Sequence, residues 1–356
     1  MRSLLPTRGY VPKPTKALLT LLILGSLFLP APFVILAPGD PQNVLGSAIK
    51  ISGTQTYPTT GKLSVTAVMI TDPDSYITAF DIFYGWVDKN RAVLPRERVY
   101  PDGETAAEAV REGAAEMSSS QVNATAAALS YLGYQIPSKL MVVGINEQTN
   151  AYQVVLINDQ ILSIDQIKLN NTNDLLRYLD GKKAGEKVSL EISRIGVGVI
   201  KKSIDLSPRE DESAFIGINI QEQFDFPFDV NIRLAETGGP SGGLIFALGI
   251  VEKLTQVDLI RSRNIAGTGT ITTNGLVGPI GGIAEKIIGA QNDGVDLFFT
   301  PINNCQDINN PDQLGAGQGG KGMKIVPVAT LAEAIEVLKL PENAKLPSCK
   351  AMPRSG

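Results

Sequence analysis

The chain carries the sequence Glu-Thr-Gly-Gly-Pro-Ser-Gly-Gly at positions 236–243, and an apolar pattern from Ser241 onward predicts a helix over 241–254. Small residues on both sides of Ser241 let its hydroxyl reach a substrate, but a serine nucleophile needs a base to activate it. The 356 residues include no histidine, so a Ser-His-Asp triad is excluded. A lysine is then the obvious candidate base, and the pattern around Lys286 supports it.

Lys286 lies on the apolar face of a second predicted helix. At about 100° per residue, that face consists of Gly282, Ile283, Lys286, Ile287 and Ala290. Burial disfavours the ammonium form and lowers the pKa of a lysine, and the resulting neutral amine can accept the serine proton. We therefore expect Lys286 to act as the general base toward Ser241.

The helix that starts at Ser241 can also stabilise a developing negative charge, because amide N–H groups and the helix dipole favour anions there. Pro240 has no N–H, so the candidate oxyanion donors are the amides of Gly239, Ser241 and Gly242. Each catalytic candidate taken alone has an ordinary structural explanation. Ser241 could cap its helix, and Lys286 could extend along the protein surface.

Three motifs surround these two residues in order: Gly-Gly-Pro-Ser-Gly-Gly at 238–243, Gly-Thr-Gly-Thr-Ile at 267–271 and Gly-Pro-Ile-Gly-Gly-Ile-Ala-Glu-Lys at 278–286. Together they closely resemble the proteolytic domain of Lon proteases. The resemblance implies a serine endopeptidase in which Ser241 is the nucleophile and Lys286 the general base. It also implies that Thr268, which stands where the family has a threonine near the lysine, orients the amine.

Three positions depart from the ATP-dependent Lon proteins, which carry Asp at Gly238, Ala at Gly242 and Glu at Thr270. The resemblance is therefore nearer to the membrane-anchored, PDZ-containing Lon-like branch, in which a PDZ domain is inserted into the protease domain. That branch implies a discontinuous protease domain and a homo-oligomeric ring that acts on protein or peptide substrates. The pattern provides no physical reason for glycine at position 238.

A glycine-rich stretch at 315–322 nearly spells a phosphate-binding loop. Gly322 replaces the Ser or Thr that would bind magnesium, and a strand rather than a helix is expected after it. We interpret this stretch as a flexible loop. Since the chain also lacks room for an AAA+ module, we expect cleavage of unfolded or extended proteins without ATP and without any cofactor.

The stretch from about 132 to 194 resembles a PDZ domain. Strands are predicted at 139–143, 153–157 and 160–164, a helix at 172–179 and a strand at 187–194. By this resemblance Leu132, Gly133, Tyr134 and Gln135 would form the loop that binds a peptide carboxylate, while the peptide adds a strand to the sheet edge. Two alternatives stay open: a spacer that binds nothing, and a catalytically silent adaptor that binds protein C-termini at the membrane.

Residues 17–39 form an uncharged run of 23 residues, long enough to span a bilayer as one helix. The residues before it include Arg2, Arg8, Lys13 and Lys16 but no acid, so the positive-inside rule predicts a cytoplasmic N-terminus. We expect a single-pass plasma-membrane protein whose catalytic domain is extracytoplasmic. A cleaved signal peptide and a buried helix are competing interpretations.

The composition excludes some classes of function. Lys and Arg number 32 against 36 Asp and Glu, which argues against a protein that binds nucleic-acid phosphates. Two cysteines without histidine disfavour a zinc site, and we expect no metal. In an oxidising compartment Cys305 and Cys349 would form a disulfide, and elsewhere they would be two free thiols.

These expectations describe an α+β protein in six parts. They are a cytoplasmic basic segment (1–16), a transmembrane anchor (17–39), a linker with the N-terminal part of the protease domain (40–130), a PDZ-like β-rich domain (131–206), a Lon-type proteolytic domain (207–340) and a C-terminal tail (341–356). A strand over 62–70 and a helix over 103–129 belong to the protease domain.

Overall fold

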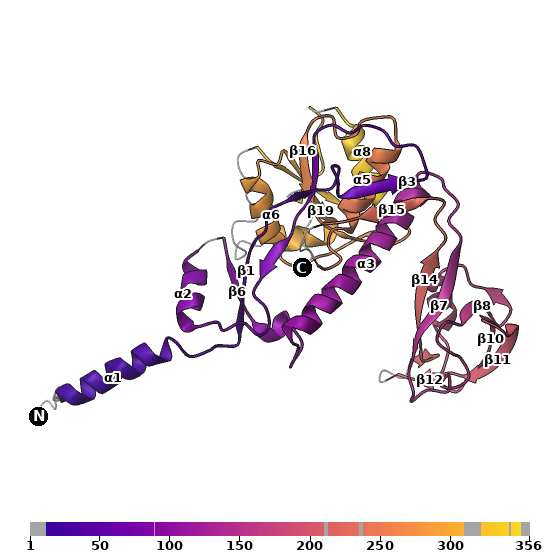
Figure 1. Ribbon diagram of the computed structural model, residues 1–356, viewed down its shortest axis with the longest axis horizontal. Helices are drawn as coiled ribbons and strands as arrows, with labels where there is room; N and C mark the ends of the chain where they lie inside the picture. The colour runs from indigo at the N-terminus through magenta and orange to yellow at the C-terminus, as the bar shows by residue number, and fades with distance from the viewer. Residues whose placement is uncertain are drawn as a thin grey trace, which may run out of the picture. The chain divides into compact units, whose positions relative to one another are not determined.

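The computed structural model describes residues 12–88, 90–209, 213–234, 238–309, 322–341 and 343–349. The chain divides into two compact units: unit 1 combines residues 1–132 with 230–356, and unit 2 consists of residues 133–229 (Figure 1). Unit 2 is thus an insertion between two segments that share one core. The basic residues Arg2 and Arg8 and the stretch 315–321 lie outside the described residues.

A five-stranded sheet forms the centre of unit 1. In spatial order its strands are β2 (Gln42–Asn43), β4 (Lys62–Val65), β16 (Asn264–Gly267), β19 (Leu297–Pro301) and β20 (Lys324–Val328). The last four strands run parallel, and β2 is antiparallel to β4. Since β4 comes from the first segment of unit 1 and β16 from the second, the two segments complete one sheet. Every residue of β19 is buried, as expected of a parallel strand covered on both faces.

Helices cover this sheet. They are α3 (Ala106–Tyr131), α5 (Gly243–Leu254), α6 (Ile283–Asn292), α7 (Cys305–Ile308) and α8 (Leu331–Lys339), with a 3₁₀ turn η2 (Ile302–Asn304) before α7. Residues 243–252 of α5 are all buried, because this helix is apolar on every side and lies against α3, α8 and β4. The N-terminus of α5 is thereby held inside unit 1.

Two short strand pairs and a disulfide complete this part of unit 1. The pairs are β3 (Ile49–Ser52) with β15 (Asp229–Ile232), and β17 (Thr270–Ile271) with β18 (Val277–Gly278). The disulfide joins Cys305 to Cys349 within an apolar cluster that includes Ile287 and Phe298. It ties the C-terminal segment to the start of α7.

A second, three-stranded sheet lies in the first segment of unit 1. In spatial order it consists of β5 (Val68–Ile70), β1 (Phe33–Pro38) and β6 (Ala92–Pro95), followed by the 3₁₀ turn η1 (Arg96–Arg98). Helix α2 (Ala79–Val87) packs on this sheet. The strand predicted over 62–70 is therefore wrong in detail, since it is two strands, β4 and β5, in different sheets.

The predicted transmembrane segment 17–39 is not one helix. Helix α1 (Lys13–Ser26) ends before Pro30, and the second apolar half forms β1 between two strands. Pro30 and Pro32 interrupt the helix because proline lacks an N–H donor. Val34, Ile35 and Leu36 are buried in unit 1. Within the described ranges, the helices are too short or too polar to cross a bilayer.

Unit 2 is a β-rich unit around one apolar core. Its sheet has the order β11-β10-β8-β7-β14, and its elements are β7 (Ser138–Ile145), β8 (Gln160–Ile164), β9 (Ile167–Lys168), α4 (Thr172–Leu179), β10 (Lys187–Arg194), β11 (Gly198–Asp205), β12 (Ser207–Pro208), β13 (Ala214–Phe215) and β14 (Ile218–Phe224). Two expectations are corrected. Residues 153–157 form turns, with Gln153 at φ 64°, and unit 2 continues past residue 206 because β14 pairs with β7.

Candidate functional site

The turn that carries Ser241 is held in place from two sides. On one side, the Gly239 N–H donates to the Gly113 carbonyl at 2.9 Å, and the Ser120 hydroxyl donates to the Pro240 carbonyl at 2.9 Å. On the other side, the Gly269 N–H donates to the Ser241 carbonyl at 2.7 Å. Helix α3 and the segment after β16 therefore fix the backbone of the nucleophile candidate. Because the Gly239 N–H is committed to Gly113, it is not an oxyanion donor, contrary to our expectation.

Lys286 is buried on α6, with 4% of its surface exposed. Burial lowers its pKa to about 8, and the negative charge of the neighbouring Glu285 offsets only part of this effect. A lysine with this pKa is neutral in a substantial fraction of molecules near neutral to mildly basic pH. It can therefore accept a proton, which an ordinary surface lysine cannot do at these pH values.

Thr268 links the lysine to the nucleophile turn. The Lys286 Nζ donates to the Thr268 Oγ1 at 3.2 Å, and the Thr268 hydroxyl donates to the Ser241 carbonyl at 3.0 Å. Because the threonine proton is committed to that carbonyl, its oxygen is left to accept from the amine. Thr268 therefore sets the direction of the amine relative to Ser241.

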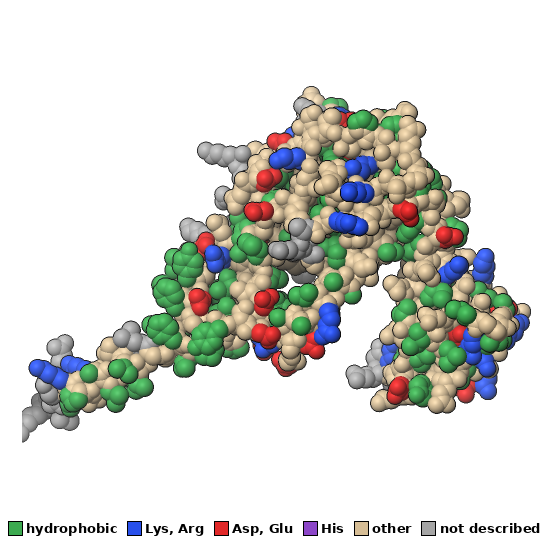
Figure 2. Space-filling view, viewed as in Figure 1, with side chains coloured by type: hydrophobic (Ala, Val, Ile, Leu, Met, Phe, Trp, Pro, Cys, Tyr) green, Lys and Arg blue, Asp and Glu red, His purple; other side chains and the backbone are tan. Residues whose placement is uncertain are grey.

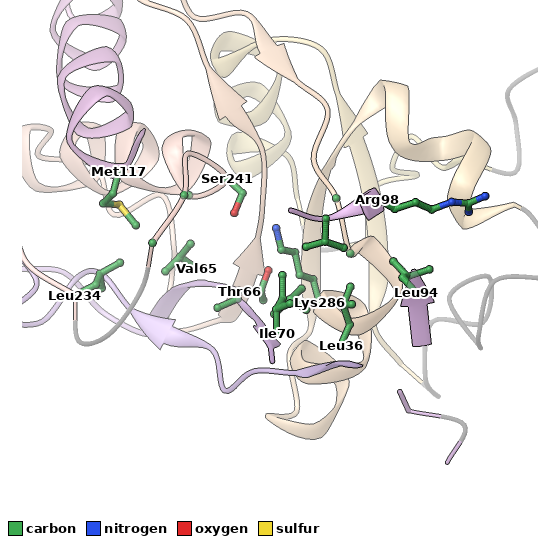
Figure 3. Close-up of a pocket in the computed structure, with 18 residues that line it drawn as sticks. Leu36, Val65, Thr66, Ile70, Leu94, Arg98, Met117, Leu234, Ser241 and Lys286 are labelled. Carbon is green, nitrogen blue, oxygen red and sulfur yellow. The ribbon is translucent and has the colours of Figure 1, made fainter. Parts of the chain in front are cut away.

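Ser241 and Lys286 face one pocket of about 480 Å³. Figure 3 shows their side chains directed toward each other across it. Most other lining side chains are apolar, and they come from both segments of unit 1: Leu36, Val65, Val68, Ile70, Leu94, Val99, Met117 and Leu234. The pocket can thus hold an apolar side chain beside a serine and a neutral amine, which is the requirement for acyl transfer by a Ser-Lys pair.

The glycines of the motif have different steric surroundings. A Cβ on Gly242 would lie 2.7 Å from Phe246 Cζ and 2.9 Å from Val65 Cγ2, so alanine would force these side chains to move. A Cβ on Gly238 would meet only Gly113, with its nearest atom at 3.4 Å, an ordinary contact distance. The structure therefore explains glycine at 242 but gives no steric reason for glycine at 238.

Thr66 and Ser120 belong to the site but were missed from the sequence. Thr66 is buried on the pocket wall, and its hydroxyl donates to the Gly267 carbonyl at 3.2 Å, next to Thr268. Ser120 lies within the alanine-rich helix α3. Neither has a sequence signal of its own, because both act through contacts with residues more than a hundred positions away.

The predicted carboxylate-binding loop at 132–135 is wrong. It leads into β7, which is paired on both sides by β8 and β14, so no free strand edge is available there for a peptide. Leu132 ends helix α3 with its N–H bonded to the Ala128 carbonyl, and Tyr134 packs edge-on against Phe228 at 5.4 Å. Leu132 and Tyr134 therefore take part in contacts within the fold.

The edge strand on this side of the unit 2 sheet is β14, in the part of the chain that the structure describes. Phe215, Ile216, Gly217 and Ile218 lead into it, and α4 lies beside it. Gly217 has φ +92°, and a Cβ there would lie 2.0 Å from Thr149 Oγ1, so only glycine fits. The alternating isoleucines that follow Gly217 were the available signal for an edge strand.

Two family models match parts of this chain. The family model for the Lon protease (S16) C-terminal proteolytic domain matches residues 197–340, and that for the PDZ domain matches residues 116–204. Among curated proteins, the Lon protease of Rhizobium meliloti is 31% identical over 40% of this chain, and that of Mesomycoplasma hyopneumoniae is 34% identical over 35%. The chain spans 18% and 16% of the length of these relatives.

Solved structures also resemble part of the chain. The PDZ domain of an SdrC-like protein from Listeria monocytogenes is 22% identical and covers 23% of this chain and 85% of its own, with a TM-score of 0.22. The corresponding Listeria innocua domain is 22% identical and covers 24% of this chain and 96% of its own, with a TM-score of 0.23.

Proposed function

With a Lon-type serine peptidase domain and a PDZ domain in this chain, we propose that it is an endopeptidase that uses a Ser241–Lys286 dyad and requires no ATP. The observation that carries the proposal is the buried amine of Lys286, which faces Ser241 and has a pKa lowered to about 8. Burying an ionisable amine destabilises the folded state. A catalytic role explains why this chain nevertheless has a buried lysine.

In the proposed mechanism, Lys286 Nζ takes the proton of Ser241 Oγ while this oxygen attacks the scissile carbonyl carbon. The N–H groups of Ser241 and Gly242, at the start of α5, would stabilise the oxyanion. The lysine ammonium then protonates the leaving amine as the C–N bond breaks, which leaves an acyl-serine. Water attacks the ester with Lys286 again as base, and Ser241 is regenerated.

The pocket supports a preference for extended substrates with an apolar side chain at the cleavage site. Its walls are mostly Leu, Val and Ile, and the rim residue Arg98 is exposed. A folded domain does not fit a pocket of about 480 Å³, so we propose that unfolded or flexible protein segments are cut. Independence from ATP is supported by Gly322, which stands where a phosphate-binding loop would have the Ser or Thr that binds magnesium.

We further propose that the N-terminal segment that includes α1 attaches the protein to the plasma membrane, with its catalytic unit on the extracytoplasmic side. The basic residues before and within the first turns of α1 support a cytoplasmic N-terminus. The disulfide between Cys305 and Cys349 agrees with an oxidising compartment. By its resemblance to Lon proteins, a homo-oligomeric ring is part of this proposal.

Product mapping by mass spectrometry tests the dyad. Wild type, Ser241→Ala and Lys286→Ala are incubated with a reduced, unfolded protein, and Lys50→Ala, which removes an exposed lysine, is the matched control. We expect fragments only from wild type and the control, cut next to apolar residues. Retention of full cleavage by both dyad variants would contradict the dyad, whereas a wild type that cuts nothing would leave the catalytically silent PDZ adaptor as the better hypothesis.

Peptide binding by unit 2 would favour the adaptor function, and it can be measured separately from cleavage. Fluorescence anisotropy with peptides that end in a free carboxylate compares wild type with Leu176→Lys, which changes an exposed side chain of α4, the helix beside β14. The adaptor hypothesis expects binding that is lost in this variant and unchanged in Ser241→Ala. Binding that depends on Ser241 would point back to the peptidase site.

A further inference from the structure

Helix α2 exposes an aromatic surface. Its inner side packs on the three-stranded sheet through Ile82 and Gly85, while its outer side carries five apolar side chains that are 53% to 68% exposed: Phe80, Phe83, Tyr84, Trp86 and Val87. Figure 2 shows apolar side chains gathered over α2 and along α1. Contiguous exposed apolar surface of this kind marks an interaction site.

The charged residues of α2 are turned away from this surface or neutralised. The Asp81 carboxylate accepts hydrogen bonds from the Thr78 amide and hydroxyl at 2.8 and 2.6 Å, which holds it at the helix start. Asp88, just after the helix, pairs with Arg91 at 3.0 Å. The outer face of α2 is thus mainly aromatic, with the Arg91 guanidinium 5.3 Å from the centre of the Tyr84 ring. Trp and Tyr are the residues enriched at membrane–water interfaces.

Exposed apolar surface continues from α2 into α1, where it consists of leucines. The end of α1 is tied to the start of α2, since the Tyr76 hydroxyl donates to the Phe28 carbonyl and the Ala31 N–H donates to the Ile77 carbonyl at 2.9 Å. Four leucines of α1 are more than half exposed and occupy about half of its circumference: Leu18, Leu19, Leu21 and Leu22. One occupant must therefore cover both helices.

A lipid bilayer fits these two surfaces better than a second copy of the chain. Lipid tails can surround a leucine-rich helix, whereas a protein partner contacts one side of it. Lys13 and Lys16 lie at the end of α1 that is away from α2, where they suit anionic headgroups. We infer that α1 inserts among lipids and that the aromatic face of α2 lies in the interfacial layer where α1 leaves the membrane. This inference rests on the proposed membrane attachment and is independent of the peptidase chemistry.

Trp86 reports directly on this contact because it is the only tryptophan of the chain. The full chain is mixed with vesicles of phosphatidylcholine and phosphatidylglycerol, with some lipids brominated near the headgroup. We expect a blue shift of tryptophan emission and quenching by the shallow bromines. Vesicle binding without either change would mean that α1 binds alone. A concentration-dependent blue shift in the absence of vesicles would identify a second copy as the occupant. Either result would overturn the inference.

A double variant separates the aromatic face from α1. Phe83→Ser with Val87→Ser removes two exposed side chains of α2 but keeps Trp86, and we expect vesicle affinity to fall at least about tenfold. The matched control is Ile195→Ser with Val197→Ser, which removes comparably exposed side chains from unit 2. Equal affinity of the two variants would contradict the inference. Cleavage of an unfolded protein in detergent checks that both variants are folded, and Ser241→Ala should bind vesicles as wild type does.

Discussion

Lys286 in unit 1 and Asp159 in unit 2 are both buried ionisable residues, but their surroundings differ. Burial acts to raise the pKa of Asp159, yet bonds from Arg194 and the Leu156 amide outweigh it, so its pKa lies below the ordinary value. The ion pair with Arg194 measures 2.7 Å. Lys286 instead has a neutral threonine hydroxyl as its bonded partner, and its pKa falls to about 8.

The difference separates a structural charge from a reactive one. A paired charge in unit 2 stabilises its fold and keeps one protonation state over a wide pH range. An amine without a strong ionic partner exchanges its proton near physiological pH, which is what a general base requires. Burial alone therefore does not identify a catalytic residue, whereas burial together with the nature of the partner does.

The largest expected effect comes from the dyad itself. Lys286→Met removes the base but keeps most of the side-chain volume, so we expect cleavage of an unfolded protein to fall by at least about a thousandfold. The free energy of unfolding should stay equal or rise, because a buried amine is replaced by an apolar group. Turnover and urea denaturation measure the two quantities, and loss of both activity and stability would make Lys286 a structural residue.

Removal of the Asp159–Arg194 ion pair of unit 2 should lower stability and leave activity unchanged, which is the opposite of the result expected for Lys286→Met. Asp159→Ala leaves Arg194 without its carboxylate and removes the acceptor of the Leu156 N–H. We expect the unfolding free energy of unit 2 to drop by about 3 kcal/mol. Hydrolysis of a short unstructured peptide should be little affected. Calorimetry and a peptide assay on the same preparation check this, and an unchanged melting temperature would contradict the assigned role.

Thr268 tests whether the amine must be oriented as well as buried. Thr268→Val removes both of its side-chain hydrogen bonds at similar volume, and we expect kcat to fall about 10- to 100-fold with a smaller change in KM. Thr268→Ser keeps the hydroxyl and should recover most of the rate. If the serine variant were as slow as the valine variant, packing of the methyl group would be the important feature.

The last prediction needs no mutation, since only the pH of the assay is changed. The base form of Lys286 is the neutral amine, so kcat/KM should rise about tenfold per pH unit up to about pH 8 and then level off. Between about pH 8 and the ordinary lysine value of 10.5, the unfolded chain binds more protons than the folded one. The contribution of Lys286 to stability therefore increases as pH rises through this window. A pH–rate profile that is flat from pH 6 to 9 would contradict the role of base.

Sequence patterns located much of the fold. The helix at 172–179 and the strand at 187–194 were predicted with the bounds that the structure shows, because each has a regular period and a clear cap or turn at its ends. The strand at 153–157 failed because Val155 is buried within a turn, and an apolar run alone does not distinguish the two. The segment 17–39 failed for a related reason, since hydropathy does not separate a membrane helix from a buried strand.

The sequence by itself singled out Ser241 and Lys286, because the absence of histidine and the phase of one helix depend only on the order of residues. Thr268 was implied by the resemblance of its motif to Lon proteases. Tertiary structure alone decided which residues surround them. Thr66, Ser120 and most of the apolar wall come from the first segment of unit 1, far from the motif in sequence. Tertiary structure also decided which strand of unit 2 lies at the sheet edge and which residue pairs with each buried charge. These features depend on contacts across the fold, and local periodicity carries no information about such contacts.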